Sequence, residues 1–123
     1  MTNPTDEFFQ QLGHRGHEPL VGRVNGALRF DVTHRGETNI HCLKIDRGHI
    51  TVCRDNGPAE CVIRVERRVM DAIVTGQANP LAAVLRGALS VEGNPEMMVI
   101  FQRLLPPPAN ARRANAVETV AGW

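Results

Sequence analysis

The sequence predicts an α+β fold, in which an antiparallel-rich β-sheet packs against several short helices. Two patterns carry this prediction. Between residues 28 and 65, apolar and polar residues alternate, which is the period of half-buried strands. Between residues 69 and 105, apolar residues recur three and four positions apart, which is typical of amphipathic helices. The chain has 123 residues, enough for one domain and too few for two of ordinary size.

Residues 1–18 are expected to form a helix followed by a connector. Thr5 is a suitable N-cap, two acidic residues follow in the first turn, and Phe8 and Leu12 lie one turn apart. A glycine, at position 13 or 16, is expected to end this helix, and the proline at position 19 marks the break.

Four strands are expected next, and the first three should form an antiparallel meander because short turns join them. The dipeptides Arg35-Gly36 and Arg47-Gly48 supply these turns, since glycine tolerates a positive φ. A longer loop over residues 55–58, composed of Asp, Asn, Gly and Pro, precedes the fourth strand. The alternating stretches lie at residues 28–33, 38–46, 50–52 and 61–65.

Three further helices and a fifth strand complete the pattern. The first of these helices, over residues 69–74, is expected to end at Gly76. Asn79-Pro80 and Asn94-Pro95 begin the other two, because Asn caps a helix and Pro suits its first position. The short strand lies at residues 89–91. The apolar side of the middle helix consists of Leu81, Val84 and Leu85, and that of the last helix of Met97, Met98, Phe101, Leu104 and Leu105.

The stretch from Arg68 to Pro106 resembles the C-terminal half of sterol carrier protein type two domains. That family tends to show an acidic residue in a helix, a glycine, an acidic residue or Asn with Pro, and an apolar helix. A second glycine, a short strand ending in Glu-Gly or Lys-Gly, and a final apolar helix then follow. In this sequence the corresponding features are Asp71, Gly76, Asn79-Pro80, residues 82–85, Gly87, residues 89–91, Glu92-Gly93 and residues 97–105.

The resemblance implies a five-stranded sheet with helices packed on one face, enclosing an apolar cavity. It implies a lipid-binding domain over residues 19–106 that binds or transports a sterol, a fatty acid or an acyl-CoA without catalysis. Residues 107–123 are expected to be a disordered or loosely held tail, because they lack a sustained apolar period. The residues expected to contact the ligand are Met70, Ile73, Val84, Leu85, Met97, Met98, Phe101, Leu104 and Leu105.

Two other functions stay open. The same cavity could belong to a small α+β enzyme, or an accessory subunit, that acts on a hydrophobic substrate of polyketide or terpenoid type. The same apolar groove could instead bind a partner protein. A buried polar group with a perturbed pKa would favour the enzyme, whereas a purely apolar lining favours the carrier.

Composition argues against several classes of partner. The formal net charge is +1, so the charge balance provides no strong electrostatic attraction to nucleic acid or to an anionic membrane surface. No stretch approaches the roughly 18 apolar residues of a membrane span, so stable membrane insertion is not expected. The first ten residues do not resemble a secretory signal, and three cysteines without close spacing do not indicate a disulfide framework. A cytoplasmic protein with reduced thiols is therefore expected.

No metal, cofactor or catalytic site is expected. His41 and Cys42 are neighbours on a strand and face opposite sides, so they do not readily share an ion. Cys53 or Cys61 could pair with His41 or His49, but nothing supplies an orienting acid. The basic residues Arg64, Arg67 and Arg68 are interleaved with acidic ones and are interpreted as a solvated helix start rather than as a site for an anionic head group.

Overall fold

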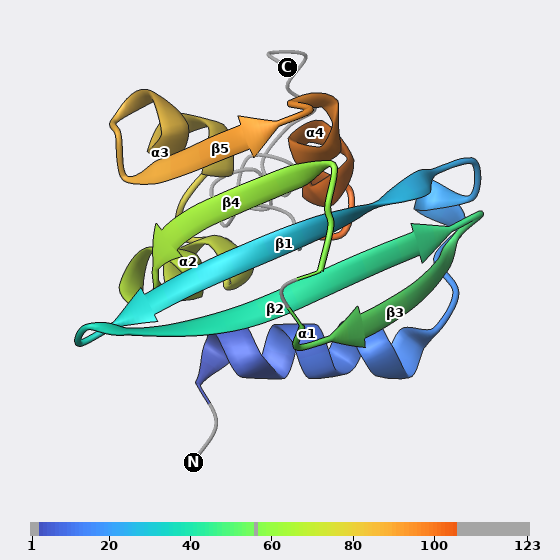
Figure 1. The fold of residues 1–123 in the computed structure, drawn as a ribbon, viewed down its shortest axis with the longest axis horizontal. Helices are drawn as coiled ribbons and strands as arrows, with labels where there is room; N and C mark the ends of the chain where they lie inside the picture. Colours follow the sequence, from blue (N-terminus) through green and yellow to red (C-terminus); the bar gives the residue numbers. More distant parts are fainter. Residues whose placement is uncertain (1–2, 56, 106–123) are drawn as a thin grey trace, which may run out of the picture.

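In the computed structural model, which describes residues 3–55 and 57–105, five strands form one sheet in the order β3-β2-β1-β4-β5 (Figure 1). Neighbouring strands are antiparallel except for β1 and β4, which are parallel. The predicted α+β fold with a mostly antiparallel sheet is thus confirmed. The strands are β1 (Asn25–His34), β2 (Glu37–Asp46), β3 (His49–Cys53), β4 (Cys61–Glu66) and β5 (Leu89–Gly93).

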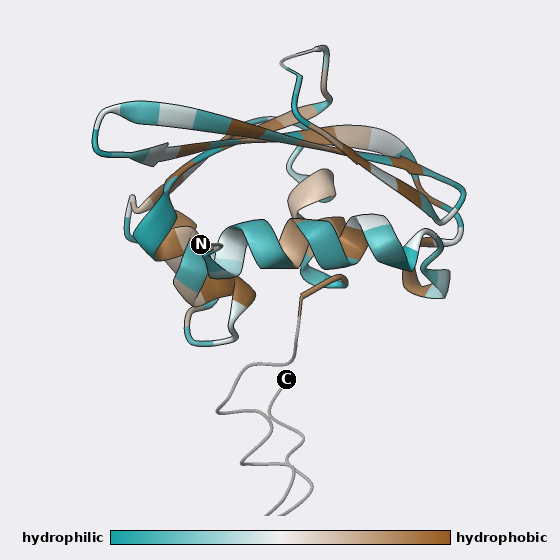
Figure 2. Cartoon of the chain, turned by 90° about the horizontal axis from the view of Figure 1, so that it is seen from below, coloured by the Kyte–Doolittle hydropathy of each residue, from teal (hydrophilic) through white to brown (hydrophobic). Residues whose placement is uncertain are grey.

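The helices lie together against one face of the sheet, as Figure 2 shows. The connection between β3 and β4 passes over the other face (Figure 1). This crossing explains the parallel pair, because β4 returns beside β1 and runs in the same direction. The helices are α1 (Pro4–Arg15), α2 (Arg67–Val74), α3 (Pro80–Leu85) and α4 (Glu96–Gln102), with a short 3₁₀ helix η1 (Pro19–Val21).

The start of α1 differs from the prediction. Asn3, not Thr5, is the N-cap: its side-chain oxygen accepts a hydrogen bond of 2.9 Å from the backbone N–H of Asp6. Thr5 lies inside the helix and is only 1% exposed. The helix continues through Gly13 and ends at Gly16, whose φ of 72° is in the left-handed region that glycine tolerates.

The two predicted tight turns are confirmed. In the β1–β2 hairpin His34 lies opposite Glu37, and in the β2–β3 hairpin Asp46 lies opposite His49. Each pairing leaves two residues in the turn, and all four of these have positive φ, as primed hairpin turns require. The turns therefore determine the register of both hairpins.

Helix α3 presents a different face from the predicted one. Its inward residues are Pro80 and Ala83, whereas Leu81 is 56% and Leu85 is 81% exposed. The helix has six residues, fewer than two turns, and it docks through its first turn. The apolar leucines are consequently left on the outer side, which hydrophobic spacing alone does not reveal.

The predicted tail, residues 107–123, lies outside the described residues. Within the described part of the chain, no helix has the length and apolar character needed to cross a membrane.

Candidate functional site

Most of the residues predicted to contact a ligand lie in one apolar layer between the sheet and the helices. They are contributed by α2 and by α4 with the turn that follows it. Each is at most 5% exposed, so the layer is closed in this structure. These buried residues are Met70, Ile73, Met97, Met98, Phe101 and Leu104.

Four phenylalanines connect this layer across the molecule. The ring of Phe101 in α4 lies 4.7 Å from that of Phe30 in β1 and 5.9 Å from that of Phe8 in α1, measured between centroids. Phe9 lies 5.2 Å from Phe30 on the same side of the sheet. Phe101 therefore joins the last helix both to the central strand and to the first helix.

The other three predicted contact residues are placed differently. Val84 and Leu105 are half-buried and pack at the margin of the core. Leu85 points away from it, because α3 docks through its opposite side. The structure therefore does not bring Leu85 together with the other members of the set.

A hollow of about 450 Å³ opens at one edge of the layer, between the end of β4 and the turn that joins α3 to β5. Val65 and Leu89, which are register partners on β4 and β5, are buried core residues that line it. Half-buried Val69 and Ala88 extend the apolar lining. The remaining lining residues are Thr33, Arg64, Glu66, Arg68, Gly87 and Ser90.

The basic residues near this hollow are mostly neutralised. Arg64 pairs with Glu92 and, at 3.8 Å, with Asp31. Arg67 approaches the carboxylate of Asp71 at 4.0 Å. These ion pairs agree with the interpretation of the basic cluster as a charged surface, and they leave the hollow with a mixed polar rim above apolar walls.

One buried polar side chain adjoins the apolar layer. His41 in β2 is 2% exposed, and its ring stacks on that of Phe9 with centroids 4.4 Å apart. Its Nε2 lies 3.5 Å from Oδ1 of Asp6, which also approaches Arg54. Burial lowers the pKa of His41, and Arg54 adds to this effect, while Asp6 opposes it.

His41 also borders a surface hollow of about 320 Å³ beside α1. Because its pKa is lowered, the imidazole is predominantly neutral at neutral pH and could accept a proton. Alternation with Leu43 and Ile45 places His41 on the inward face of its strand, but no signal in the sequence indicated that it would stack on Phe9.

The buried cysteines are not activated nucleophiles. Burial, together with a smaller contribution from the adjacent Cys53, raises the pKa of the Cys42 thiol to about 12. Burial also raises the pKa of Cys61. Both thiols are therefore protonated at neutral pH, which is the opposite of what a catalytic cysteine requires.

Residues 7–106 match the sequence model of the SCP-2 sterol transfer family. The chain is also 27% identical over 110 residues to sterol carrier protein 2 of Gallus gallus. That alignment covers 86% of this chain and 20% of the chicken protein, so the chain spans about a fifth of the length of this relative.

Solved structures have the same fold. Sterol carrier protein 2 from Aedes aegypti, determined in complex with palmitate, superposes with a TM-score of 0.68 at 21% identity. The match covers 86% of this chain and 100% of the mosquito protein. An inverting sec-alkylsulfatase from Pseudomonas superposes with a TM-score of 0.68 at 17% identity, over 81% of this chain but only 16% of the sulfatase. The fold therefore occurs both as a whole small protein and as a minor part of an enzyme.

Proposed function

The chain belongs to the SCP-2 sterol transfer family, and from that premise we propose that it binds an apolar, lipid-like ligand without catalysing a reaction. The proposed ligand is a sterol, a fatty acid or an acyl-CoA. The observation that carries the proposal is the apolar layer formed by α2, α4 and the sheet, with Phe101 at its centre. The palmitate complex of the Aedes aegypti protein, which shares the fold, supports this choice of ligand.

Binding requires the helices to part from the sheet, because the layer is closed in this structure. The elements that have to move are short, since α3 has six residues and α4 has seven. Met97 and Met98 on α4 are flexible and polarizable, so they can repack around an inserted chain. We propose the hollow beside Val69 and Leu89 as the mouth through which the ligand enters.

The energetics favour weak and promiscuous binding. Burying about ten methylene groups contributes about 8 kcal/mol, at about 0.8 kcal/mol each. Association costs at least about 4 kcal/mol, and opening a closed layer adds to this cost. The balance, at most about 4 kcal/mol for about ten methylene groups, corresponds to a dissociation constant of about 1 mM or weaker.

The experiment is displacement of a fluorescent fatty acid from the full-length protein by sterols, fatty acids and acyl-CoAs. Saturable binding that unlabelled long-chain lipids reverse is the expected result. Absence of saturable binding by all three classes would exclude the carrier function. An extrinsic fluorophore is required because the one tryptophan lies at position 123, outside the described residues.

A second candidate function, catalysis on a hydrophobic substrate, is favoured by His41. A neutral, buried imidazole beside Asp6 is a possible general base next to an apolar layer. Native mass spectrometry of freshly purified protein distinguishes the two functions. An intact co-purified lipid supports the carrier, whereas conversion of that lipid during incubation, lost in His41→Gln, supports an enzyme.

A further inference from the structure

Two cysteines and an aspartate come together on the face of the sheet that the helices do not cover. Cys42 lies between His41 and Leu43 on β2; both belong to the inner, helix-covered side, so Cys42 faces the other way. Cys53, the last residue of β3, is its register partner. Asp55 follows two residues later, at the start of the connection that crosses this outer face (Figure 1).

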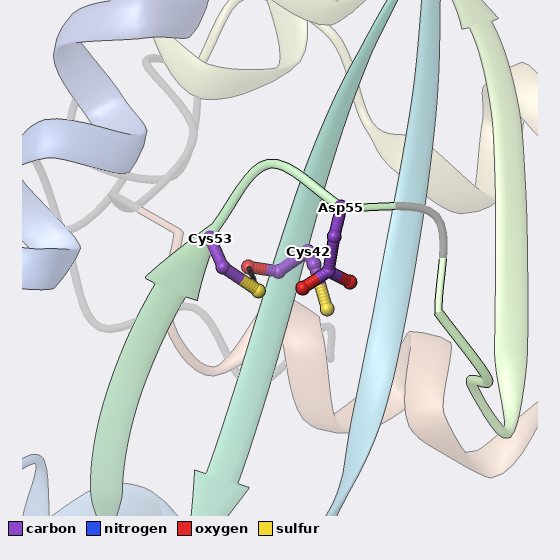
Figure 3. Close-up of side chains that lie close together, drawn as sticks. All are labelled: Cys42, Cys53 and Asp55. Carbon is purple, nitrogen blue, oxygen red and sulfur yellow. Dashed lines mark hydrogen bonds between the residues drawn. The ribbon is translucent and has the colours of Figure 1, made fainter.

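The donor atoms of the three side chains converge. The two Sγ atoms and a carboxylate oxygen of Asp55 all lie within 4.8 Å of one another. Figure 3 shows the two sulfur atoms and the carboxylate turned toward the same space. Cys53 Sγ donates a weak hydrogen bond of 3.8 Å to the backbone oxygen of Cys42, so the two thiols are not joined in a disulfide.

We propose that Cys42, Cys53 and Asp55 bind one zinc ion, with water in the fourth position. Thiolate and carboxylate are both ligands that Zn²⁺ accepts, at about 2.3 Å for sulfur and about 2.0–2.2 Å for oxygen. Tetrahedral donors at those distances are about 3.5–3.8 Å apart, so small side-chain rotations convert the present arrangement into a zinc site. The two thiol protons leave to solvent when the ion binds.

Burial is graded across the three ligands in a way that suits an ion entering from solvent. Cys42 is fully buried, Cys53 is half-buried and Asp55 is exposed. Oδ1 of Asp55 accepts a hydrogen bond of 3.0 Å from the backbone N–H of Gly57, which orients the carboxylate and leaves Oδ2 available. The side chain most accessible to the incoming ion is therefore already positioned.

Nearby charges compensate for the charge of the occupied site. Two thiolates and one carboxylate around Zn²⁺ leave one net negative charge. Arg29 is the register partner of Cys42 on β1, and Lys44 lies two residues further along the same face of β2. Asp31 forms an ion pair with the guanidinium of Arg29 at 3.0 Å and offsets its charge, so the compensating charge comes chiefly from Lys44.

The ion would fasten the end of β3 and the start of the crossing connection to β2. This site lies on the face of the sheet opposite the apolar layer, so the inference does not depend on the proposed lipid binding (Figure 2). Its failure would leave the carrier proposal unchanged.

The test is titration of the full-length, chemically reduced protein with Cd²⁺, which reports thiolate coordination by an ultraviolet charge-transfer band. One ion per chain is expected to bind wild type and Cys61→Ala alike, because Cys61 faces the core. Cys53→Ser is expected to abolish the band. Asp55→Asn, which keeps the oxygen that bonds Gly57, is expected to weaken binding by about tenfold or more.

The exposed position of Asp55 keeps the test informative if the cysteine variants are poorly folded. Zn²⁺ is expected to raise the Tm of wild type in proportion to the logarithm of its concentration and to raise that of Asp55→Asn much less. Saturable Cd²⁺ binding that survives Cys53→Ser, or that depends on Cys61 instead, would overturn the proposal. Absence of a charge-transfer band in reduced wild-type protein would do the same.

Discussion

The carboxylate of Asp71 in α2 accepts two hydrogen bonds from Thr5 in α1: one of 2.6 Å from the hydroxyl and one of 3.1 Å from the backbone N–H. The two residues are 66 positions apart in the sequence. Asp71 thus supplies an anionic partner to the positive N-terminal end of α1. The acidic residue that marks the first helix of the family pattern has a structural role here, because it holds the two helices together.

Removal of the Thr5 hydroxyl should destabilise the protein. Thr5→Ala removes the 2.6 Å hydrogen bond that the buried hydroxyl donates to the carboxylate of Asp71. A hydrogen bond to a charged group contributes about 1.5–3 kcal/mol to the free energy of unfolding. Urea unfolding should therefore show a loss within that range. Thr5→Ser keeps the hydroxyl and should lose much less; equal losses in the two variants would show that the methyl group matters and the hydrogen bond does not.

Truncation of Phe101 should lower the free energy of unfolding by as much as truncation of a well-packed core residue. Phe101 is 1% exposed and contacts both Phe8 and Phe30, so Phe101→Ala is expected to lose about 3–5 kcal/mol of unfolding free energy. Its folded fraction should also bind the fluorescent fatty acid more weakly, since a ring contact with the ligand is removed. Leu85→Ala is the control: this side chain is 81% exposed and should change stability by less than about 0.5 kcal/mol. Unchanged affinity in folded Phe101→Ala would place Phe101 in the core alone.

Gly93 should tolerate no side chain. Its φ is +100°, and a Cβ atom there would lie 2.1 Å from the backbone oxygen of Glu60, which accepts a hydrogen bond from Asn94. Gly93→Ala should therefore lower the free energy of unfolding by more than about 2 kcal/mol. Gly36→Ala isolates the clash, because Gly36 also has a positive φ of 80° but nothing lies within 4 Å of its Cβ position. That control should lose only about 1 kcal/mol, and similar losses for both would refute the close approach as the cause.

Acidification should destabilise the protein through His41. Burial lowers its pKa in the folded state below the ordinary value of 6.5, so the unfolded chain binds the proton more readily. The contribution of His41 to stability is therefore complete above pH 6.5 and is lost as the pH falls from that value through the lowered pKa. The free energy of unfolding of wild type and of His41→Gln should be compared at neutral pH and at pH 5. The variant should show a smaller acid loss, whereas His14→Gln, an exposed histidine, should behave like wild type; an unchanged loss in His41→Gln would contradict the assignment.

Much of the fold could be predicted from local pattern. Alternation identified the strands, and the two Arg-Gly turns determined the hairpin registers, because a two-residue turn leaves one way to pair the flanking residues. Of the three Asn-Pro dipeptides, Asn79-Pro80 begins α3 as predicted, with Asn79 as the N-cap. The prediction for α4 was one residue early: Pro95 is its N-cap, and Asn94, just before it, accepts a hydrogen bond from the N–H of Glu96. The third dipeptide, Asn3-Pro4, begins α1, where the prediction had chosen Thr5 as the cap. The Arg47-Gly48 turn pairs Asp46 with His49, and extending that register along the two strands pairs Cys42 with Cys53. This part of the proposed zinc site could therefore be predicted from the sequence.

The tertiary structure alone decided the rest. The parallel pairing of β4 with β1 and the outward face of α3 both depend on contacts between segments distant in sequence. The same holds for the buried stack of His41 on Phe9 and for the position of Asp55 above Cys42. Sequence period determines which residues can share a face, because it follows from the local geometry of strands and helices. Which face becomes buried, and which polar groups meet across it, depends on how the elements pack, since the free energy of burial belongs to the whole assembly and not to any one segment.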